Sequence, residues 1–290
     1  MGENSCVRGE LWRQAARRIE RLDARLLLEH VCGCTHAGLI AHPERAMSEA
    51  QAAHFEELVS RRAAGEPLAY LVGSAWFGGL EFVVNHAVLI PRPETELLVD
   101  LAARRAQGLD KPRIVDLGTG SGIVAVLLAR RCPQAGVSAT DISAAALDVA
   151  RANAARHGVT VRFLEGDWYA PLGDERFDLI VSNPPYVVDG DPHLALNGLP
   201  FEPPQALSDG VKGGDGLACI RRIVAAASRH LEPDGWLLVE HGYNQALAVR
   251  ELLSEAGFRE AASWRDDAGI ERVSGGLRAE WRNLNKSALS

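Results

Sequence analysis

Apolar residues in the first part of the chain recur at spacings of three and four, which is the period of a helix with one buried face. Leu11, Ala15, Ile19, Leu22 and Leu26 fall on such a face. The pattern therefore predicts a helix along this segment.

A second helix is predicted to begin at Ser48. Its hydroxyl can accept a hydrogen bond from the first helical turn while the side chain of Gln51 reaches back, which is the capping-box arrangement. Phe55, Leu58 and Val59 then supply an apolar stripe. We expect residues 1–64 to form a small helical domain.

The pattern changes over residues 65–93, where glycines separate short β-rich runs. Leu80, Phe82 and Val84 occupy alternate positions, as in a strand that buries one face. We expect a β-hairpin linker here. A helix should follow it, beginning near Thr95.

Short apolar strands alternate with helical stretches from Arg113 onward. Such alternation implies βαβ units, a parallel sheet covered on both faces, and right-handed crossovers. Ligands of these α/β sheets bind beyond the carboxyl ends of the strands. The expected strands are the runs RIVDLG, VSATDI, VRFLEGD, FDLIVSN and GWLLVEHG, with further strand-like runs near 270–273 and 277–281.

Charge and composition narrow the possible functions. The 290 residues carry a formal net charge of −7, whereas proteins that neutralise nucleic-acid phosphates need a surplus of Lys and Arg. No run approaches the ~20 consecutive apolar residues of a membrane span, and the N-terminus lacks the apolar segment of a signal peptide. The five scattered cysteines suit reduced thiols. We expect a cytoplasmic protein without stable nucleic-acid binding and without membrane association.

A glycine-rich turn, DLGTGSG, joins the first strand of the predicted sheet to a helix. Glycines let a backbone approach a ligand closely, and a helix N-terminus offers unpaired N–H groups. Ile123 stands where a dinucleotide fingerprint would have its third glycine, which disfavours NAD and FAD. The candidate cofactor-binding residues of this turn are Gly118, Thr119, Gly120, Ser121 and Gly122.

The next two strands end on residues suited to adenosine. Asp141 follows the second strand and can accept hydrogen bonds from both ribose hydroxyls. Asp167 follows the third strand and could bond an adenine amino group, while Trp168 could cover the ring. Each residue alone has a structural explanation, such as a helix cap or a core aromatic. Three strand ends in the correct order favour an adenosine site.

The fourth strand ends in NPPY, residues 183–186. A planar NH₂ group presents two donors, and the side-chain oxygen of Asn183 and the main-chain oxygen of Pro184 can accept both. The prolines, Pro184 and Pro185, fix the backbone, and Tyr186 offers a face against which a flat group can pack. We predict that this strand end holds a planar nitrogen next to the cofactor, and that Asn183 also borders the cofactor.

Two other features have simpler explanations. The run HVCGCTH contains metal-ligand residue types, but a single residue separates Cys32 from Cys34, whereas zinc sites usually have two to four residues between their cysteines. We predict no metal site. The Arg-rich run RQAARRIERLDAR also contains Glu20 and Asp23, which favours a solvated helix face. Contact of this face with an acidic or RNA-bound partner stays open.

DLGTGSG followed by NPPY resembles the class I S-adenosylmethionine-dependent methyltransferases that modify planar nitrogens. Further runs make the likeness more specific. Over nearly the whole chain, the sequence is similar to the release factor glutamine methyltransferases of the PrmC/HemK type. These runs are EPLAYLVG, VLIPRPETELLVD, GDW, EPPQAL with GGDGL, and GIERV.

The resemblance implies an α/β fold: a Rossmann-like seven-stranded catalytic domain over residues 94–290, preceded by the hairpin linker and by a helical substrate-recognition domain. It implies methyl transfer from S-adenosyl-L-methionine, leaving S-adenosyl-L-homocysteine, to the glutamine of the Gly-Gly-Gln loop of class 1 peptide chain release factors. By the same resemblance, the glycine turn contacts the methionine part of the cofactor, Asn183 to Tyr186 hold the substrate amide, and Phe77 packs against the substrate glutamine.

Two other functions compete with this one. An adenine-N6 methyltransferase acting on DNA or RNA would use the same NPPY grip on a flipped base. The acidic charge and the lack of a basic recognition segment disfavour it. A non-catalytic cofactor-binding scaffold could dispense with the grip, so the intact NPPY run disfavours that alternative.

Overall fold

The computed structural model describes residues 7–196 and 198–278. The chain forms two compact units. The first contains the chain up to Ser74 together with His193–Phe201, and the second contains Ala75–Pro192 and the chain from Glu202 onward. The sequence patterns did not predict that His193–Phe201 belongs to the first unit.

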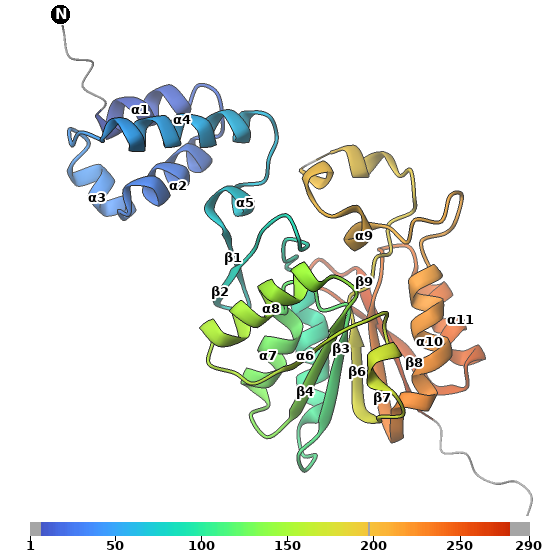
Figure 1. The fold of residues 1–290 in the computed structure, drawn as a ribbon. Coiled ribbons are helices and arrows are strands. Elements are labelled where there is room, and N and C mark those ends of the chain that lie inside the picture. Colours follow the sequence, from blue (N-terminus) through green and yellow to red (C-terminus); the bar gives the residue numbers. More distant parts are fainter. Residues whose placement is uncertain (1–6, 197, 279–290) are drawn as a thin grey trace, which may run out of the picture. The chain divides into compact units, whose positions relative to one another are not determined.

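The first unit is helical, as expected (Figure 1). Its core contains Leu27, Leu28, Phe55, Leu58 and Val59. Its elements are the helices α1 (Arg8–Ala15), α2 (Arg21–Cys32), α3 (His36–Ala41), α4 (Glu49–Ala63) and α5 (Leu68–Val72), with short 3₁₀ turns at Pro192–Ala195 and Leu199–Phe201.

The capping box predicted at the start of α4 is confirmed. The Ser48 hydroxyl accepts from the Gln51 N–H at 3.2 Å, and the Gln51 side chain accepts from the Ser48 N–H at 3.2 Å. Each bond satisfies a backbone donor that a helix N-terminus would otherwise leave unpaired. This pairing explains why α4 begins where the sequence predicted.

The segment predicted as one helix forms two, α1 and α2, so the prediction of a single continuous apolar face was wrong. The chain turns after Ala15, where the Arg18 N–H donates to the Ala15 carbonyl at 2.8 Å, and a new helix begins at Arg21. Leu22 is 52% exposed. The new helix instead buries Ala24, Leu27 and Leu28, so its buried face does not continue that of α1. The helix α5 lies within residues 65–93, where only a β-hairpin linker was expected.

The second unit contains the predicted hairpin and a seven-stranded sheet in the order β5-β4-β3-β6-β7-β9-β8. Strands up to β7 run parallel, and β9 runs antiparallel to both of its neighbours. The hairpin consists of β1 (Ser74–Phe77) and β2 (Leu80–Val83), and the sheet strands are β3 (Arg113–Leu117), β4 (Gly136–Asp141), β5 (Arg162–Glu165), β6 (Phe177–Ser182), β7 (Leu231–Glu240), β8 (Phe258–Arg265) and β9 (Glu271–Arg278).

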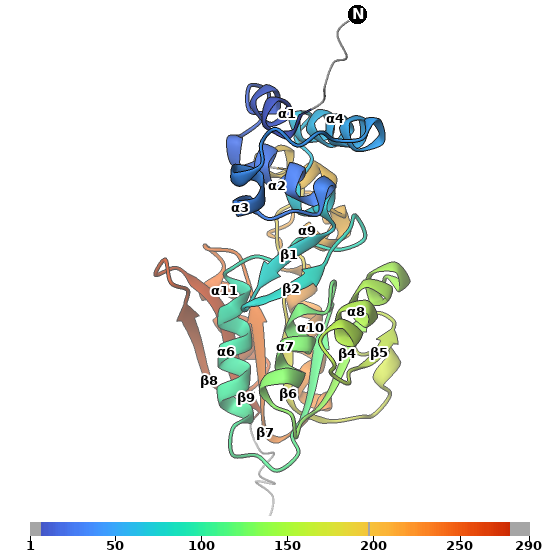
Figure 2. The same cartoon turned by 90° about the vertical axis from the view of Figure 1, so that its left-hand side faces the viewer.

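Helices cover both faces of this sheet, as Figures 1 and 2 show. Residues of α6 and α7 enter one apolar core, and those of α10 and α11 enter the other. Central strands are therefore apolar on both sides, which explains their continuous hydrophobic runs. The helices are α6 (Thr95–Ala106), α7 (Ile123–Arg131), α8 (Ala144–Arg156), the short α9 (Pro204–Leu207), α10 (Ala218–His230) and α11 (Ala246–Glu255).

The strand-like runs predicted at 270–273 and 277–281 belong to one strand, β9, as far as Arg278. The rest of the second run lies outside the described residues. No helix within 7–196 and 198–278 combines the length and the apolar character needed to cross a bilayer.

Asn153 on α8 ties the hairpin to the glycine-rich turn. Its side chain accepts from the Val83 N–H at 2.7 Å and donates to the Val83 carbonyl at 3.0 Å. The same amide donates to the carbonyl of Ser121 at 2.8 Å. Because Asn153 is fully buried, these bonds satisfy an amide that would be costly to bury alone.

Candidate active site

A cavity of about 370 Å³ lies at the carboxyl ends of β3, β4 and β6. This is where ligands of open α/β sheets bind. The predicted residues that line the cavity are Gly118, Thr119, Gly120, Ser121, Asp141, Asp167, Trp168, Asn183 and Pro185.

The glycine-rich turn needs its glycines for conformation and for space. Gly118, Gly120 and Gly122 have φ angles of 71°, 54° and 81°, a region that disfavours side chains. A Cβ on Gly118 would lie 3.0 Å from the Trp168 ring, and one on Gly122 would lie 2.9 Å from the Cβ of Ala150. Gly122 therefore serves the packing of α7 against α8 and does not line the cavity itself.

Asp141, the last residue of β4, fixes the shape of this turn. Its Oδ2 accepts from the Gly120 N–H at 2.8 Å, and its Oδ1 accepts from the Ser143 N–H at 2.9 Å. Burial raises the pKa of the Asp141 carboxyl, and these backbone bonds partly offset the rise. The side chain of Ser143, rather than that of Asp141, accepts the capping bond of α8.

A second buried carboxyl, that of Asp116, also forms a hydrogen bond with the glycine-rich turn. Asp116 on β3 is 1% exposed, and its Oδ2 accepts from the Thr119 hydroxyl at 2.6 Å. Burial raises the pKa of Asp116 to about 7. Sequence reasoning placed the start of the glycine turn at this residue but gave it no role.

Asp167 and Trp168 follow β5 and border the cavity together. The Trp168 ring lies against Gly118, and Trp168 itself has a φ of 48°, which is uncommon for a bulky residue. Asp167 forms an ion pair with Arg222 on α10. The Asp167 carboxylate thus has a protein partner as well as access to the cavity.

The NPPY run continues β6 into the cavity edge. The Asn183 Nδ2 donates to the Thr95 hydroxyl at 3.0 Å, so Oδ1 is the group of this amide left to accept a hydrogen bond. Pro184 is buried and Pro185 lines the cavity. The Tyr186 hydroxyl donates to Oε1 of Glu240 at 3.3 Å, and burial raises the pKa of Tyr186.

Gln245 binds the backbone at the end of this run, at Tyr186, and no sequence pattern indicated this role. Its Nε2 donates to the carbonyl oxygens of Tyr186 at 3.1 Å and of Asp215 at 3.0 Å. Its Oε1 accepts from the Gly242 N–H at 2.8 Å. One buried side chain therefore joins three backbone segments at the end of the NPPY run.

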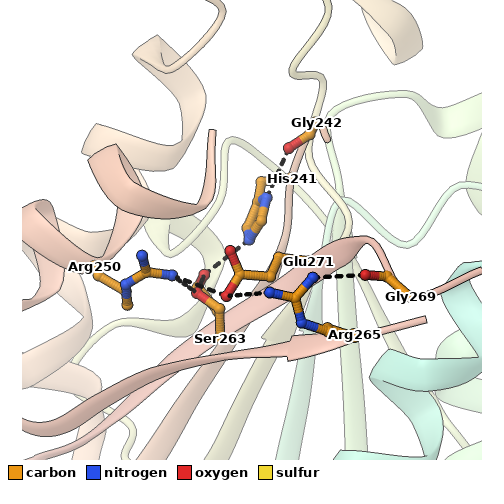
Figure 3. A network of polar contacts seen from close by, with 8 residues as sticks. His241, Gly242, Arg250, Ser263, Arg265, Gly269 and Glu271 are labelled. Atoms are coloured by element: carbon orange, nitrogen blue, oxygen red, sulfur yellow. Dashed lines mark hydrogen bonds and ion pairs between the residues drawn. The ribbon is translucent and has the colours of Figure 1, made fainter. Parts of the chain in front are cut away.

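A polar network joins the end of β7 to β8, β9 and α11 (Figure 3). The buried His241 ring contacts the Gly242 carbonyl through Nδ1 at 2.9 Å and the Ser274 hydroxyl through Nε2 at 2.8 Å. Ser274 contacts Ser263 at 2.7 Å, and Arg250 donates to Ser263 at 2.6 Å. Burial lowers the pKa of His241, which favours a neutral ring in this network.

Two of the further sequence motifs meet at Glu202, the first residue of EPPQAL. Its carboxylate is 3% exposed, accepts from the Ile90 N–H at 3.0 Å and pairs with Arg92. Both partners belong to the VLIPRPETELLVD run. The bonds therefore join two segments that border the cavity.

Phe77 is not among the residues that line the cavity. It is 3% exposed and packs in the apolar core, with its ring 6.4 Å from that of Phe82. The alternation of the strand places this side chain inward. Its contact with a substrate glutamine stays a prediction that this burial does not support.

Comparison with known proteins places the chain in a family. A release factor glutamine methyltransferase of Bordetella pertussis is 52% identical over 259 residues, covering 89% of this chain and 95% of that protein. The chain belongs to the release factor glutamine methyltransferase family. A second member, from Xylella fastidiosa, is 49% identical over 90% of this chain and 94% of its own length. The PrmC N-terminal domain model matches residues 11–73, and the methyltransferase small domain model matches residues 93–198.

Solved structures support the fold of this family member. A methyltransferase from Pyrococcus furiosus has a TM-score of 0.52 at 17% identity, over 76% of this chain and 98% of its own. A T. thermophilus 16S rRNA N2 methyltransferase, solved with AdoMet and guanosine, has a TM-score of 0.52 at 21% identity, over 71% of this chain and 49% of its own. The likeness shows a class I methyltransferase fold for the sheet.

Proposed function

We propose that this protein transfers a methyl group from S-adenosyl-L-methionine to the side-chain amide nitrogen (N5) of the glutamine in the Gly-Gly-Gln loop of class 1 release factors. The observation that carries the proposal is the Asn183 amide, whose Oδ1 is left to accept at the edge of the cavity. Family membership over most of the chain supports the choice of substrate. We place the reaction in the cytoplasm, where release factors act.

The cavity has a volume that suits a small ligand. Pockets for small ligands start at roughly 300 Å³. Gly120 lines the cavity, and no heavy atom lies within 4 Å of the position that a Cβ would take there, so glycine leaves space that a side chain would fill. Gly118 to Ser121 would hold the methionine part, and Asp141 the ribose. Asp167 and Trp168 would hold the adenine.

The substrate nitrogen needs help because an amide lone pair is delocalised. When bound, S-adenosyl-L-methionine supplies an activated methyl group on a sulfonium. Asn183 Oδ1 and the Pro184 carbonyl accept the two N–H bonds of the substrate amide, increase electron density on its nitrogen, and orient its lone pair. Positioning of this kind promotes the transfer, and the methylated nitrogen, which then carries one proton too many, releases that proton to solvent.

Mass spectrometry tests the proposal. A purified class 1 release factor is incubated with the protein and S-adenosyl-L-methionine, digested, and sequenced by fragmentation. We expect one added methyl group on the side chain of the loop glutamine. A release factor with alanine in place of that glutamine is the matched control, and it should gain none. Methylation of nucleic acid but not of the factor would favour the adenine-N6 alternative.

A further inference from the structure

Two prolines leave the backbone of the NPPY run with few hydrogen-bond donors. Proline has no N–H, so the peptide units that precede Pro184 and Pro185 cannot be oriented by donating a hydrogen bond. The path of this backbone therefore depends on the residues that hold its two ends. At the first end, β6 pairs with β3 and with β7 as far as Ser182.

At the second end, the peptide unit between Tyr186 and Val187 is held on both sides. Its carbonyl oxygen accepts from Nε2 of Gln245 at 3.1 Å. Its N–H, which belongs to Val187, donates to the Leu207 carbonyl at 2.9 Å. Because a peptide unit is planar, the two bonds together fix its orientation.

The orientation of the Gln245 amide follows from the nature of its partners. Oε1 accepts from the Gly242 N–H, and Nε2 donates to the carbonyl oxygens of Tyr186 and Asp215. A backbone N–H only donates and a carbonyl only accepts, so a reversed amide would lose all three bonds. The residue is 7% exposed, so water replaces lost bonds poorly.

The GGDGL motif, to which the proposed function gives no role, lies against the same Tyr186 carbonyl. The Asp215 carboxylate accepts from the Leu217 N–H at 3.1 Å and pairs with Arg221 on α10, which ties this loop to the helix. Gly216 has a φ of 73°, and a Cβ there would lie 2.3 Å from the Tyr186 carbonyl oxygen. Only glycine lets the loop approach this carbonyl so closely.

We propose that Gln245 and Gly216 are positioning residues for methyl transfer, which hold the Tyr186 carbonyl and thereby keep the NPPY run at the edge of the cavity. This inference rests on the proposed function. Neither residue is among those that line the cavity, so each acts through the run and not by touching cofactor or substrate. A displacement of about 1 Å far from the reacting atoms can slow a reaction about 10²-fold.

Gly216→Ala and Gly213→Ala form a matched pair within one loop. Gly213 has a φ of 67°, and no heavy atom of the described residues lies within 4 Å of its Cβ position. Both substitutions therefore strain the backbone, but only Gly216→Ala presses on the Tyr186 carbonyl. With cofactor and release factor saturating, we expect the single-turnover rate to fall about 10-fold or more in Gly216→Ala and less than about threefold in Gly213→Ala.

Gln245→Met tests the hydrogen bonds to the same carbonyl. Methionine is close to glutamine in length but forms none of the three bonds. Val249→Ala is the control, because Val249 lies one turn further along α11 and is fully buried. Both variants should have a lower melting temperature, but only Gln245→Met should lose about 10-fold or more in rate, with affinity for S-adenosyl-L-methionine largely retained.

Amide hydrogen exchange tests the structural step without any methyl transfer. Mass spectrometry follows exchange in the peptide that contains Tyr186 and Val187. If the bond from Gln245 holds this peptide unit, exchange there should be faster in Gln245→Met than in Val249→Ala, and faster in Gly216→Ala than in Gly213→Ala.

The outcomes separate the two levels of the argument. Failure of the unsubstituted protein to methylate the factor would refute the proposed function, and the exchange measurement would still test the hold on Tyr186. Equal rates in Gly216→Ala and Gly213→Ala would refute the role of Gly216, and a normal rate in Gln245→Met would refute that of Gln245. Faster exchange with normal rates would show that the reaction does not need this hold, and would overturn the inference.

Discussion

The carboxylate of Asp141 accepts a hydrogen bond from the backbone N–H of Gly120 at 2.8 Å. This bond joins the end of β4 to the turn after β3, so the proposed ribose ligand also shapes the loop that would hold the methionine part of the cofactor. Loss of Asp141 should therefore affect cofactor binding in two ways.

Asp141→Ala is expected to weaken binding of S-adenosyl-L-methionine by about 1.5–3 kcal/mol, the range for hydrogen bonds to a charged group. Titration calorimetry measures the change directly. Asp148→Ala is a matched control, because Asp148 is an exposed aspartate on α8 that pairs only with Arg151 among the described residues. Equal affinity of the Asp141 and Asp148 variants would reduce Asp141 to a structural residue of the turn.

Gly118→Ala is expected to displace Trp168, because the new Cβ would lie 3.0 Å from the indole ring. Backbone strain at a φ of 71° adds a cost of order 1–3 kcal/mol. Gly108→Ala is the control, since Gly108 has a φ of 87° but open space around it. Both variants should lose stability, but only Gly118→Ala should lose cofactor affinity and alter tryptophan fluorescence. Normal cofactor affinity in Gly118→Ala would contradict a close approach at this turn.

Much of this site could be predicted because its signals are local. The glycine turn and the NPPY run each lie within a few residues, and each is recognisable by residue type. The partners of the run could not be predicted in this way. Thr95 is 88 residues from Asn183, and Glu240 is 54 residues from Tyr186, so only the packing of α6 and β7 beside β6 brings them together.

The fold shows the same division. Alternating strands and helices predicted the α/β sheet, and the capping box predicted the start of α4. The break between helices after Ala15 could not be predicted, because apolar residues at spacings of three and four continue across it without a proline or glycine. The assignment of His193–Phe201 to the first unit depends on contacts distant in sequence, which no local pattern reveals.

Stability should depend on the protonation of Glu240. Burial raises its pKa to about 7, above the ordinary value of 4.5; hydrogen bonds from Thr95 and Tyr186 and the charge of Arg272 oppose the rise, and the charge of Glu94 adds to it. Because the folded-state pKa is raised, this contribution to stability is fully present below the unfolded value and is lost as pH rises through about 7.

Glu240→Gln tests this dependence, because glutamine stays neutral. Between about pH 5 and about pH 8, the free energy of unfolding should fall more for the unsubstituted protein than for Glu240→Gln. Asp116 also has a pKa of about 7 but is present in both proteins, so the difference between them isolates Glu240. Denaturant titrations at several pH values give the comparison, and parallel curves would contradict a titrating Glu240.

A folded release factor should be a much better substrate than free glutamine or a short Gly-Gly-Gln peptide. Remote contacts with a folded factor can align one loop glutamine, whereas ordering a flexible peptide costs about 0.5–1.5 kcal/mol for each immobilised side chain, besides the backbone cost. We propose that the helical unit supplies such contacts. Values of kcat/KM for the factor and for its isolated loop peptide decide the matter, and equal values would leave that unit without a recognition role.

The central claim is that Asn183 holds the glutamine amide for methylation. The most direct measurement is the single-turnover rate of methyl transfer to the loop glutamine by the unsubstituted protein and by Asn183→Ala, with both saturated by S-adenosyl-L-methionine. We expect a loss of about 10²-fold or more in Asn183→Ala, as when a preorganised group aimed at the reacting centre is removed, with cofactor affinity largely retained. A near-normal rate in Asn183→Ala would contradict the proposed grip.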